Sequence, residues 1–135
     1  AEQAFRLSAR ALDATTLEIR FDVADGYYLY RDKLKFAVEP ATAGAGVPVL
    51  PPGKVIEDEF FGRVATYRGP VVIQLPLAAG QPGGSVSLEV DSQGCADAGV
   101  CYPPQQQRLT LPLPRAGAAP SAPVDASPSK KSYFN

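Results

Sequence analysis

The residues best suited to chemistry are Cys95 and Cys101, the only two cysteines in the chain. Two thiols this close in sequence can form a disulfide, and a disulfide that opens and closes can pass electrons to another protein. The bond would close a ring of seven residues, with Gly94 beside it and Gly99 inside it to permit sharp turns. Such a ring contributes only about 2.4 kcal/mol by the loop-entropy relation, which is at the low end for a disulfide that serves stability.

A purely structural bond is the second interpretation of the same pair. Small exported domains commonly carry structural disulfides, and the spacing alone leaves both interpretations open. The chain has no His, which removes the usual imidazole base and the commonest zinc ligand. Two cysteines without His cannot complete a structural zinc site. The sequence therefore predicts no metal, and no cofactor beyond a redox-active Cys95–Cys101 disulfide.

Short segments with alternating apolar and polar residues must position these cysteines, and this alternation is typical of half-buried β-strands. The segments fall at residues 5–11, 17–23, 34–38, 71–77, 86–90 and 109–113. Turn-forming residues separate several of them, and the cysteines lie between the last two. About seven short strands in one domain predict an all-β protein, an immunoglobulin-like antiparallel β-sandwich with the cysteine pair at one end.

Composition predicts the domain boundaries, and the charge and the apolar runs exclude several classes of protein. The pattern predicts one folded domain over residues 1–114 and a Pro-, Ala- and Ser-rich linker or tail over 115–135. A net charge of −1 gives no electrostatic footprint for nucleic acid. No apolar run is long enough to cross a bilayer, so no direct membrane insertion of this fragment is expected. We expect a monomer.

Three separated stretches resemble, in the same order, the N-terminal periplasmic domain of the thiol:disulfide interchange protein family DsbD. They are DGYYLYR at residues 25–31, EDEFFG at 57–62 and GCADAGVCYPP at 94–104. The resemblance implies an immunoglobulin-like fold, a periplasmic location and a protein-disulfide reductase activity, as one domain of a multidomain enzyme. It also implies that Cys101 forms mixed disulfides with partners and that Cys95 resolves them.

The acidic and aromatic segment at residues 57–62 has two interpretations. From its residues alone it is an acidic loop with one aromatic side chain in the core. The resemblance implies a cap loop, in which Phe60 covers the disulfide while Asp58 and Glu59 tune the sulfurs or assist proton movement. Phe61 and Gly62 complete that loop.

Three tyrosines follow the turn at Asp25 and Gly26. On a strand, Tyr28 and Tyr30 face one side and Tyr27 faces the other. Core packing with the hydroxyl groups at the surface is the ordinary interpretation of such a cluster. The resemblance implies instead that Tyr28 and Tyr30 lie near the cysteines and support the active site.

Two functions remain as hypotheses. The first is a periplasmic electron shuttle, which accepts electrons from the C-terminal thioredoxin-like domain of its own parent protein. By resemblance, it passes them to oxidised disulfide isomerases and to thioredoxins of cytochrome c maturation. The second is a non-catalytic immunoglobulin-like binding module with a structural disulfide. Reversible reduction of the pair with retention of the fold would distinguish the shuttle from the module.

Overall fold

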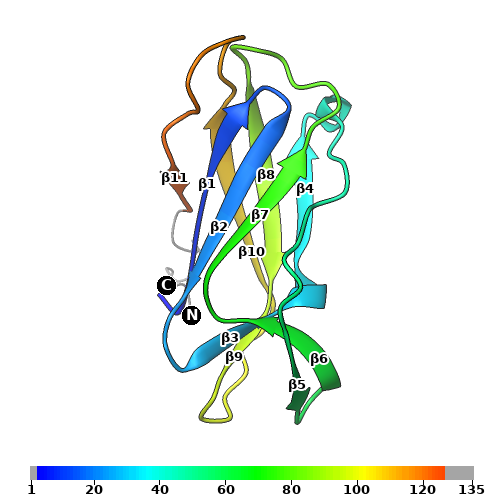
Figure 1. The fold of residues 1–135 in the computed structure, drawn as a ribbon, viewed down its shortest axis with the longest axis vertical. Helices are drawn as coiled ribbons and strands as arrows, with labels where there is room; N and C mark the ends of the chain where they lie inside the picture. The colour runs from blue at the N-terminus through cyan, green and yellow to red at the C-terminus, as the bar shows by residue number, and fades with distance from the viewer. Residues whose placement is uncertain (1–2, 127–135) are drawn as a thin grey trace, which may run out of the picture.

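The computed structural model describes residues 3–126, which form an all-β domain of antiparallel sheets (Figure 1). The first large sheet has the order β11-β1-β2-β7 and consists of Val124–Asp125, Phe5–Asp13, Thr16–Val23 and Gly69–Pro76. The second has the order β10-β8-β4 and consists of Gln105–Pro112, Ser85–Ser92 and Lys35–Glu39. Two short 3-10 helices, Arg31–Lys33 and Ala41–Ala43, flank β4.

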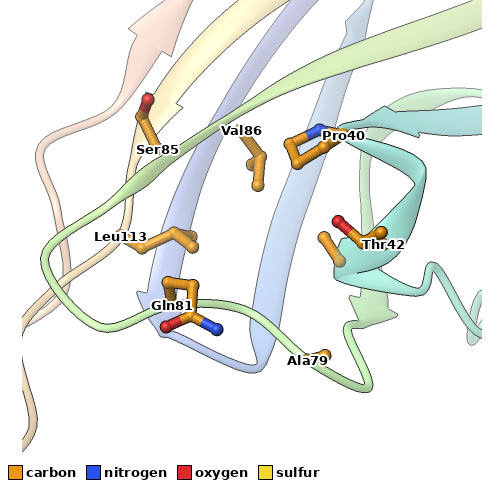
Figure 2. A pocket seen from close by; sticks show the side chains of 8 residues that line it. Pro40, Thr42, Ala79, Gln81, Ser85, Val86 and Leu113 are labelled. Atoms are coloured by element: carbon orange, nitrogen blue, oxygen red, sulfur yellow. The ribbon is translucent and has the colours of Figure 1, made fainter.

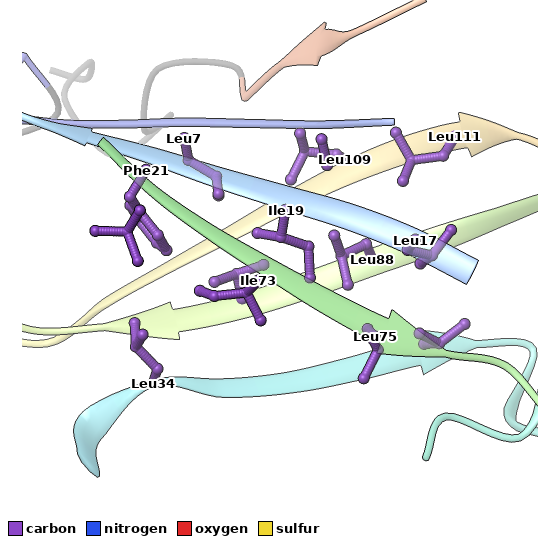
Figure 3. Close-up of a cluster of buried hydrophobic side chains, with 14 of the residues drawn as sticks. Leu7, Leu17, Ile19, Phe21, Leu34, Ile73, Leu75, Leu88, Leu109 and Leu111 are labelled. Atoms are coloured by element: carbon purple, nitrogen blue, oxygen red, sulfur yellow. The ribbon is translucent and has the colours of Figure 1, made fainter. Parts of the chain in front are cut away.

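The core fills the space between these two sheets, as Figure 3 shows. Register pairs such as Ile19 with Ile73 on β2 and β7 present apolar side chains to the same interior, where Leu88 and Leu111 of the other sheet meet them. All four side chains are fully buried. Each such burial contributes about 1.5–3 kcal/mol. The alternating segments of the sequence thus form strands that bury one face each. The predicted fold class, an immunoglobulin-like antiparallel β-sandwich, is confirmed.

A third, smaller sheet lies across one end of the sandwich (Figure 1). Its order is β5-β6-β3-β9, formed by Lys54–Asp58, Gly62–Tyr67, Tyr27–Tyr30 and Gly94–Ala96. The β5–β6 hairpin was not predicted, because its outer side chains are charged or exposed and show no apolar alternation. It covers the cysteine end of the domain instead of the core.

The other end of the sandwich holds a cavity of about 240 Å³ (Figure 2). Its lining contains no charged side chain, nucleophilic cysteine or metal ligand pair, and is formed by Pro40, Thr42, Ala43, Ala79, Gln81, Ser85, Val86 and Leu113. Strand β8 begins here at Ser85 and leads toward β9 at the opposite end. The two cysteines lie at that opposite end of the sandwich, on and beside β9.

The segment after β10 returns along the outer edge of β1. Strand β11 pairs with β1 at Ser8 and Ala9, and Ser121 exchanges hydrogen bonds with the backbone of Ala11 at 2.9 Å. Residues up to 126 thus contact the sandwich, although their composition predicts a linker. Residues 127–135, the rest of that predicted linker, lie outside the described residues. No helix within residues 3–126 has the length and apolar character needed to cross a membrane.

Candidate redox site

Cys95 and Cys101 form a disulfide at the end of the sandwich that the small sheet covers. Strand β9 pairs with β3 and places Cys95 opposite Tyr28. Cys95 is completely buried, whereas Cys101 is half-buried. The two cysteine residues therefore differ in exposure, and Cys101 is the more exposed of the two. The predicted position of the pair at one end is confirmed.

Gly94 permits this deep placement of Cys95. A Cβ atom added at Gly94 would lie 2.5 Å from the carbonyl oxygen of Tyr28 and 2.7 Å from the ring of Phe5. No side chain fits there, because β9 approaches β3 and the Phe5 ring too closely. Phe5 also meets the rings of Tyr27 and Tyr102 edge to face. These three aromatics form one wall beside the cysteine loop.

Tyr28 and Tyr30 share one face of β3 with the buried sulfur. The Tyr30 hydroxyl lies 2.9 Å from Cys95 Sγ and 3.7 Å from Cys101 Sγ, and the two tyrosine rings meet edge to face. Tyr27 points to the opposite side, as strand geometry predicts. The structure thus brings both predicted tyrosines to the disulfide with their hydroxyl groups buried, and their supporting role stays a prediction.

Asp58, the last residue of β5, is a buried carboxylate with four hydrogen-bond donors. Tyr28 and Tyr30 donate their hydroxyl hydrogens to its Oδ2 at 2.6 and 2.7 Å. The backbone N–H groups of Phe60 and Phe61 donate to its Oδ1 at 2.8 and 2.9 Å. Burial raises the pKa of Asp58, but these hydrogen bonds outweigh it and lower the pKa to about 2. Asp58 is therefore ionised at neutral pH.

The same environment keeps the tyrosine hydroxyl groups protonated. Burial, followed by the hydrogen bond to the Asp58 carboxylate, raises the pKa of Tyr28 and of Tyr30. A neutral phenol donating to a charged carboxylate forms a strong hydrogen bond. The arrangement fixes β3 to the β5–β6 hairpin immediately beside the sulfurs.

The turn of the hairpin carries the remaining residues of the predicted cap loop. Glu59, Phe60, Phe61 and Gly62 are all exposed, and Gly62 has a φ of +73°, a conformation that favours glycine. The Phe61 ring packs edge to face on Tyr30, with ring centroids 5.0 Å apart, and Lys33 Nζ lies 4.6 Å from the Phe61 ring centroid. Phe60 is 58% exposed. Phe61 is thus the ring held against Tyr30, and the lid role of Phe60 stays a prediction.

Three residues near the cysteine loop were not predicted from the sequence as part of the site. Phe5 and Tyr102 belong with Tyr27 to the aromatic wall, and Arg68 reaches the cysteine loop from the connection between β6 and β7. The signal for Tyr102 was its place directly after Cys101. Arg68 gave no signal, because a single arginine between two strands is ordinary in a sequence.

An immunoglobulin-like sandwich with a half-buried cysteine bonded to a buried one at its end defines a disulfide-bearing domain suited to exchange with other thiols. The chain matches the family described as "Thiol:disulfide interchange protein DsbD, N-terminal" over residues 1–113. The chain belongs to this family of N-terminal DsbD domains.

Curated relatives and solved structures agree with this assignment. The chain is 46% identical over 130 residues to thiol:disulfide interchange protein DsbD of Ralstonia nicotianae and 43% identical over 128 residues to DsbD 1 of Pseudomonas aeruginosa. These alignments cover 95% and 93% of this chain. The chain spans about a fifth of the length of these relatives, 21% in both cases.

Two solved structures are similar over most of the chain. The reduced N-terminal domain of Neisseria meningitidis DsbD has a TM-score of 0.78 at 32% identity, with 93% of both chains covered. A second structure comes from the complex between the N-terminal domains of DsbD and PilB from the same species, with a TM-score of 0.69, 34% identity and 90% of both chains covered.

Proposed function

We propose that this domain is a protein-disulfide reductase module that exchanges electrons with other proteins through Cys95 and Cys101. The observation that carries the proposal is the unequal exposure of the two bonded cysteines, with Cys95 buried and Cys101 half-buried. Membership in the DsbD N-terminal family supports it.

The exchange proceeds in two balanced steps. The Cys101 thiol loses its proton, and its thiolate attacks one sulfur of an oxidised partner's disulfide, which forms a mixed disulfide and releases the first partner thiolate. The Cys95 thiol then loses its proton and attacks Cys101 Sγ, which closes the internal disulfide and releases the second partner thiolate. Two electrons and two protons reach the partner in total. Reduction of the domain by an upstream dithiol runs the same steps in reverse.

The residues around the sulfurs have distinct roles in the proposed exchange. Tyr30, 2.9 Å from Cys95 Sγ, gives the buried sulfur a hydrogen-bond partner, and the ionised Asp58 holds Tyr30 in place. Asp58 also fixes the hairpin turn that carries Phe60 as a lid over the disulfide. Glu59 is exposed on the same turn and would face an incoming partner.

The proposal also covers the proteins that exchange electrons with this domain and the compartment in which they meet. We propose that the upstream donor is a C-terminal thioredoxin-like domain of the same parent protein in the periplasm. The acceptors are oxidised disulfide isomerases and thioredoxins of cytochrome c maturation. The solved complex of a related DsbD domain with a PilB domain supports partners of the thiol-oxidoreductase kind.

A redox titration tests the exchange function. The domain is equilibrated in buffers of reduced and oxidised glutathione, free thiols are trapped by alkylation, and the fold of each sample is followed by circular dichroism. We expect reversible cycling with the β-sheet signal retained in both states. A disulfide that resists reduction, or a fold that is lost on reduction, would contradict the exchange function and support a structural disulfide instead.

A further inference from the structure

The loop between the cysteines carries only one polar side chain. That side chain belongs to Asp97, and the other four positions are alanine, glycine or valine. The first half of the loop is held by the pairing of β9 with β3 and by a hydrogen bond from Asp97 N–H to the Gly26 carbonyl at 2.8 Å. The second half is exposed at Ala98, Gly99 and Val100. The exposed half is joined to Ala96 by hydrogen bonds from the Gly99 N–H and to the Val100 carbonyl. Asp97 is therefore the corner at which the half of the loop that pairs with β3 meets the exposed half.

Arg68 binds this corner with both ends of its guanidinium group. Its two terminal nitrogens donate to the two carboxylate oxygens of Asp97 at 2.9 and 2.7 Å. Arg68 also donates to the Tyr27 carbonyl at 3.3 Å and lies over the Tyr28 ring at 5.3 Å. A bidentate contact of this kind fixes direction as well as distance. The pair joins the cysteine loop to the connection between β6 and β7.

We propose that Arg68 is a positioning residue for the redox pair, holding the Asp97 corner so that the two thiols of the reduced domain stay ready to close. The proposal rests on the exchange function above and adds a residue that sets the balance between the dithiol and the disulfide. The disulfide and the ion pair restrain the same loop, so each reduces the entropy that the other must remove. Because coupling between two interactions is reciprocal, the ion pair favours the disulfide by the same factor as the disulfide favours the ion pair.

The reaction that tests the proposal is the oxidation of the protein dithiol to its disulfide by glutathione disulfide. The two thiols of Cys95 and Cys101 give two electrons and two protons to one glutathione disulfide. One bond forms between Cys95 Sγ and Cys101 Sγ, and two glutathione thiols are released. The equilibrium constant of this reaction is the effective concentration of one protein thiol at the other. It reports loop restraint directly.

The expected size of the effect follows from the exposure of the Arg68–Asp97 ion pair. The Arg68 and Asp97 side chains are 45% and 49% exposed, and half-exposed ion pairs have modest effects. We expect Asp97→Asn and Arg68→Gln each to lower the equilibrium constant about two- to fivefold. A fivefold change equals about 20 mV for a two-electron couple. The double variant should resemble the single variants, because either change alone removes the pair.

Glu89→Gln is the matched control. Glu89 accepts a hydrogen bond from Arg108 at 2.7 Å, so this change also removes one exposed ion pair of the same length, on the β8–β10 ladder and outside the cysteine loop. Its equilibrium constant should equal that of the unmodified domain. Raising the salt concentration from 0.1 to 1 M should bring the unmodified domain toward the Asp97→Asn value and leave that variant nearly unchanged.

The possible results distinguish a failure of the positioning role of Arg68 from a failure of the exchange function. If the unmodified domain cycles in glutathione but Asp97→Asn has the same equilibrium constant, Arg68 does not position the pair. Effects of the two single changes that multiply in the double variant would also overturn the inference, because the residues would then act independently. If the unmodified domain fails to cycle at all, it is the exchange function that is wrong. Thermal unfolding of the oxidised variants checks that each is folded.

Discussion

The Tyr30 hydroxyl lies 2.9 Å from Cys95 Sγ while it donates its single hydrogen to Asp58 Oδ2 at 2.7 Å. Its oxygen can then accept a hydrogen bond from the Cys95 thiol once the disulfide is open. A buried thiol that donates to this hydroxyl is held inside the domain, away from an approaching partner. Cys95 is thus suited to wait as the resolving thiol, and the more accessible Cys101 is suited to meet the partner.

Replacing either cysteine separates their roles. We expect Cys101→Ala to abolish covalent complexes with an oxidised thioredoxin-like partner, because the accessible thiol is gone. Cys95→Ala should accumulate them, because the mixed disulfide on Cys101 has no resolving thiol. Non-reducing gel electrophoresis measures both outcomes, and the opposite pattern would reverse the assignment.

Asp58 should make the stability of the domain depend on acid pH. Its pKa is about 2 in the folded domain, below the ordinary 3.8, so its contribution is complete above pH 4 and is lost as the pH falls from about 4 to 2. We expect Asp58→Asn to lower the free energy of unfolding by about 1–3 kcal/mol at pH 7. That difference should shrink toward pH 2 in urea denaturation. Glu57→Gln, on the exposed neighbouring carboxylate, is the control and should show no such convergence.

Phe60 should act as a gate over the disulfide. We expect Phe60→Ala to accelerate reduction by dithiothreitol severalfold, with only a modest change in reduction potential, because a lid changes access to the bond and not its energy. Phe61→Ala is the matched comparison, since Phe61 packs on Tyr30. Stopped-flow rates that rise more for Phe61→Ala would transfer the lid role to Phe61. Equal rates for all three proteins would leave neither ring as a gate.

Gly94 should be the glycine near the cysteines that tolerates substitution least. An added Cβ would meet the Tyr28 carbonyl oxygen and the Phe5 ring, both inside contact distance, so we expect Gly94→Ala to cost at least about 2 kcal/mol. Gly99 has open space around it but a φ of +102°, so Gly99→Ala should cost about 1–2 kcal/mol from backbone strain alone. Urea denaturation of the two oxidised variants gives the comparison. A smaller loss at Gly94 than at Gly99 would contradict the close approach of β9 to β3.

The sandwich was predictable because its core strands each bury one face. Ile19, Ile73 and Leu88 belong to alternating segments that can satisfy that alternation only as half-buried strands. The β5–β6 hairpin was not predictable in the same way. Its residues Glu57 and Arg63 pair at exposed positions, and its buried carboxylate, Asp58, accepts hydrogen bonds from tyrosines about thirty residues earlier in the sequence.

From the residues alone, without the family resemblance, the site was predictable only where its residues are neighbours in sequence. The spacing of Cys95 and Cys101 predicts that they can form a disulfide but leaves its role open, and the placement of Tyr28 and Tyr30 on one face follows from strand periodicity. The approach of Arg68 to Asp97 depends on how the small sheet docks on the sandwich. No local pattern encodes a contact of that kind.

Strand β11 has a consequence for how the domain behaves in concentrated solution. It covers part of the outer edge of β1, where unpaired N–H and C=O groups would otherwise offer a template to a second copy of the chain. A fragment ended at residue 114, the boundary that composition predicts, keeps both cysteines but loses this cover. We expect such a fragment to associate edge to edge and precipitate at concentrations at which the longer chain stays dissolved.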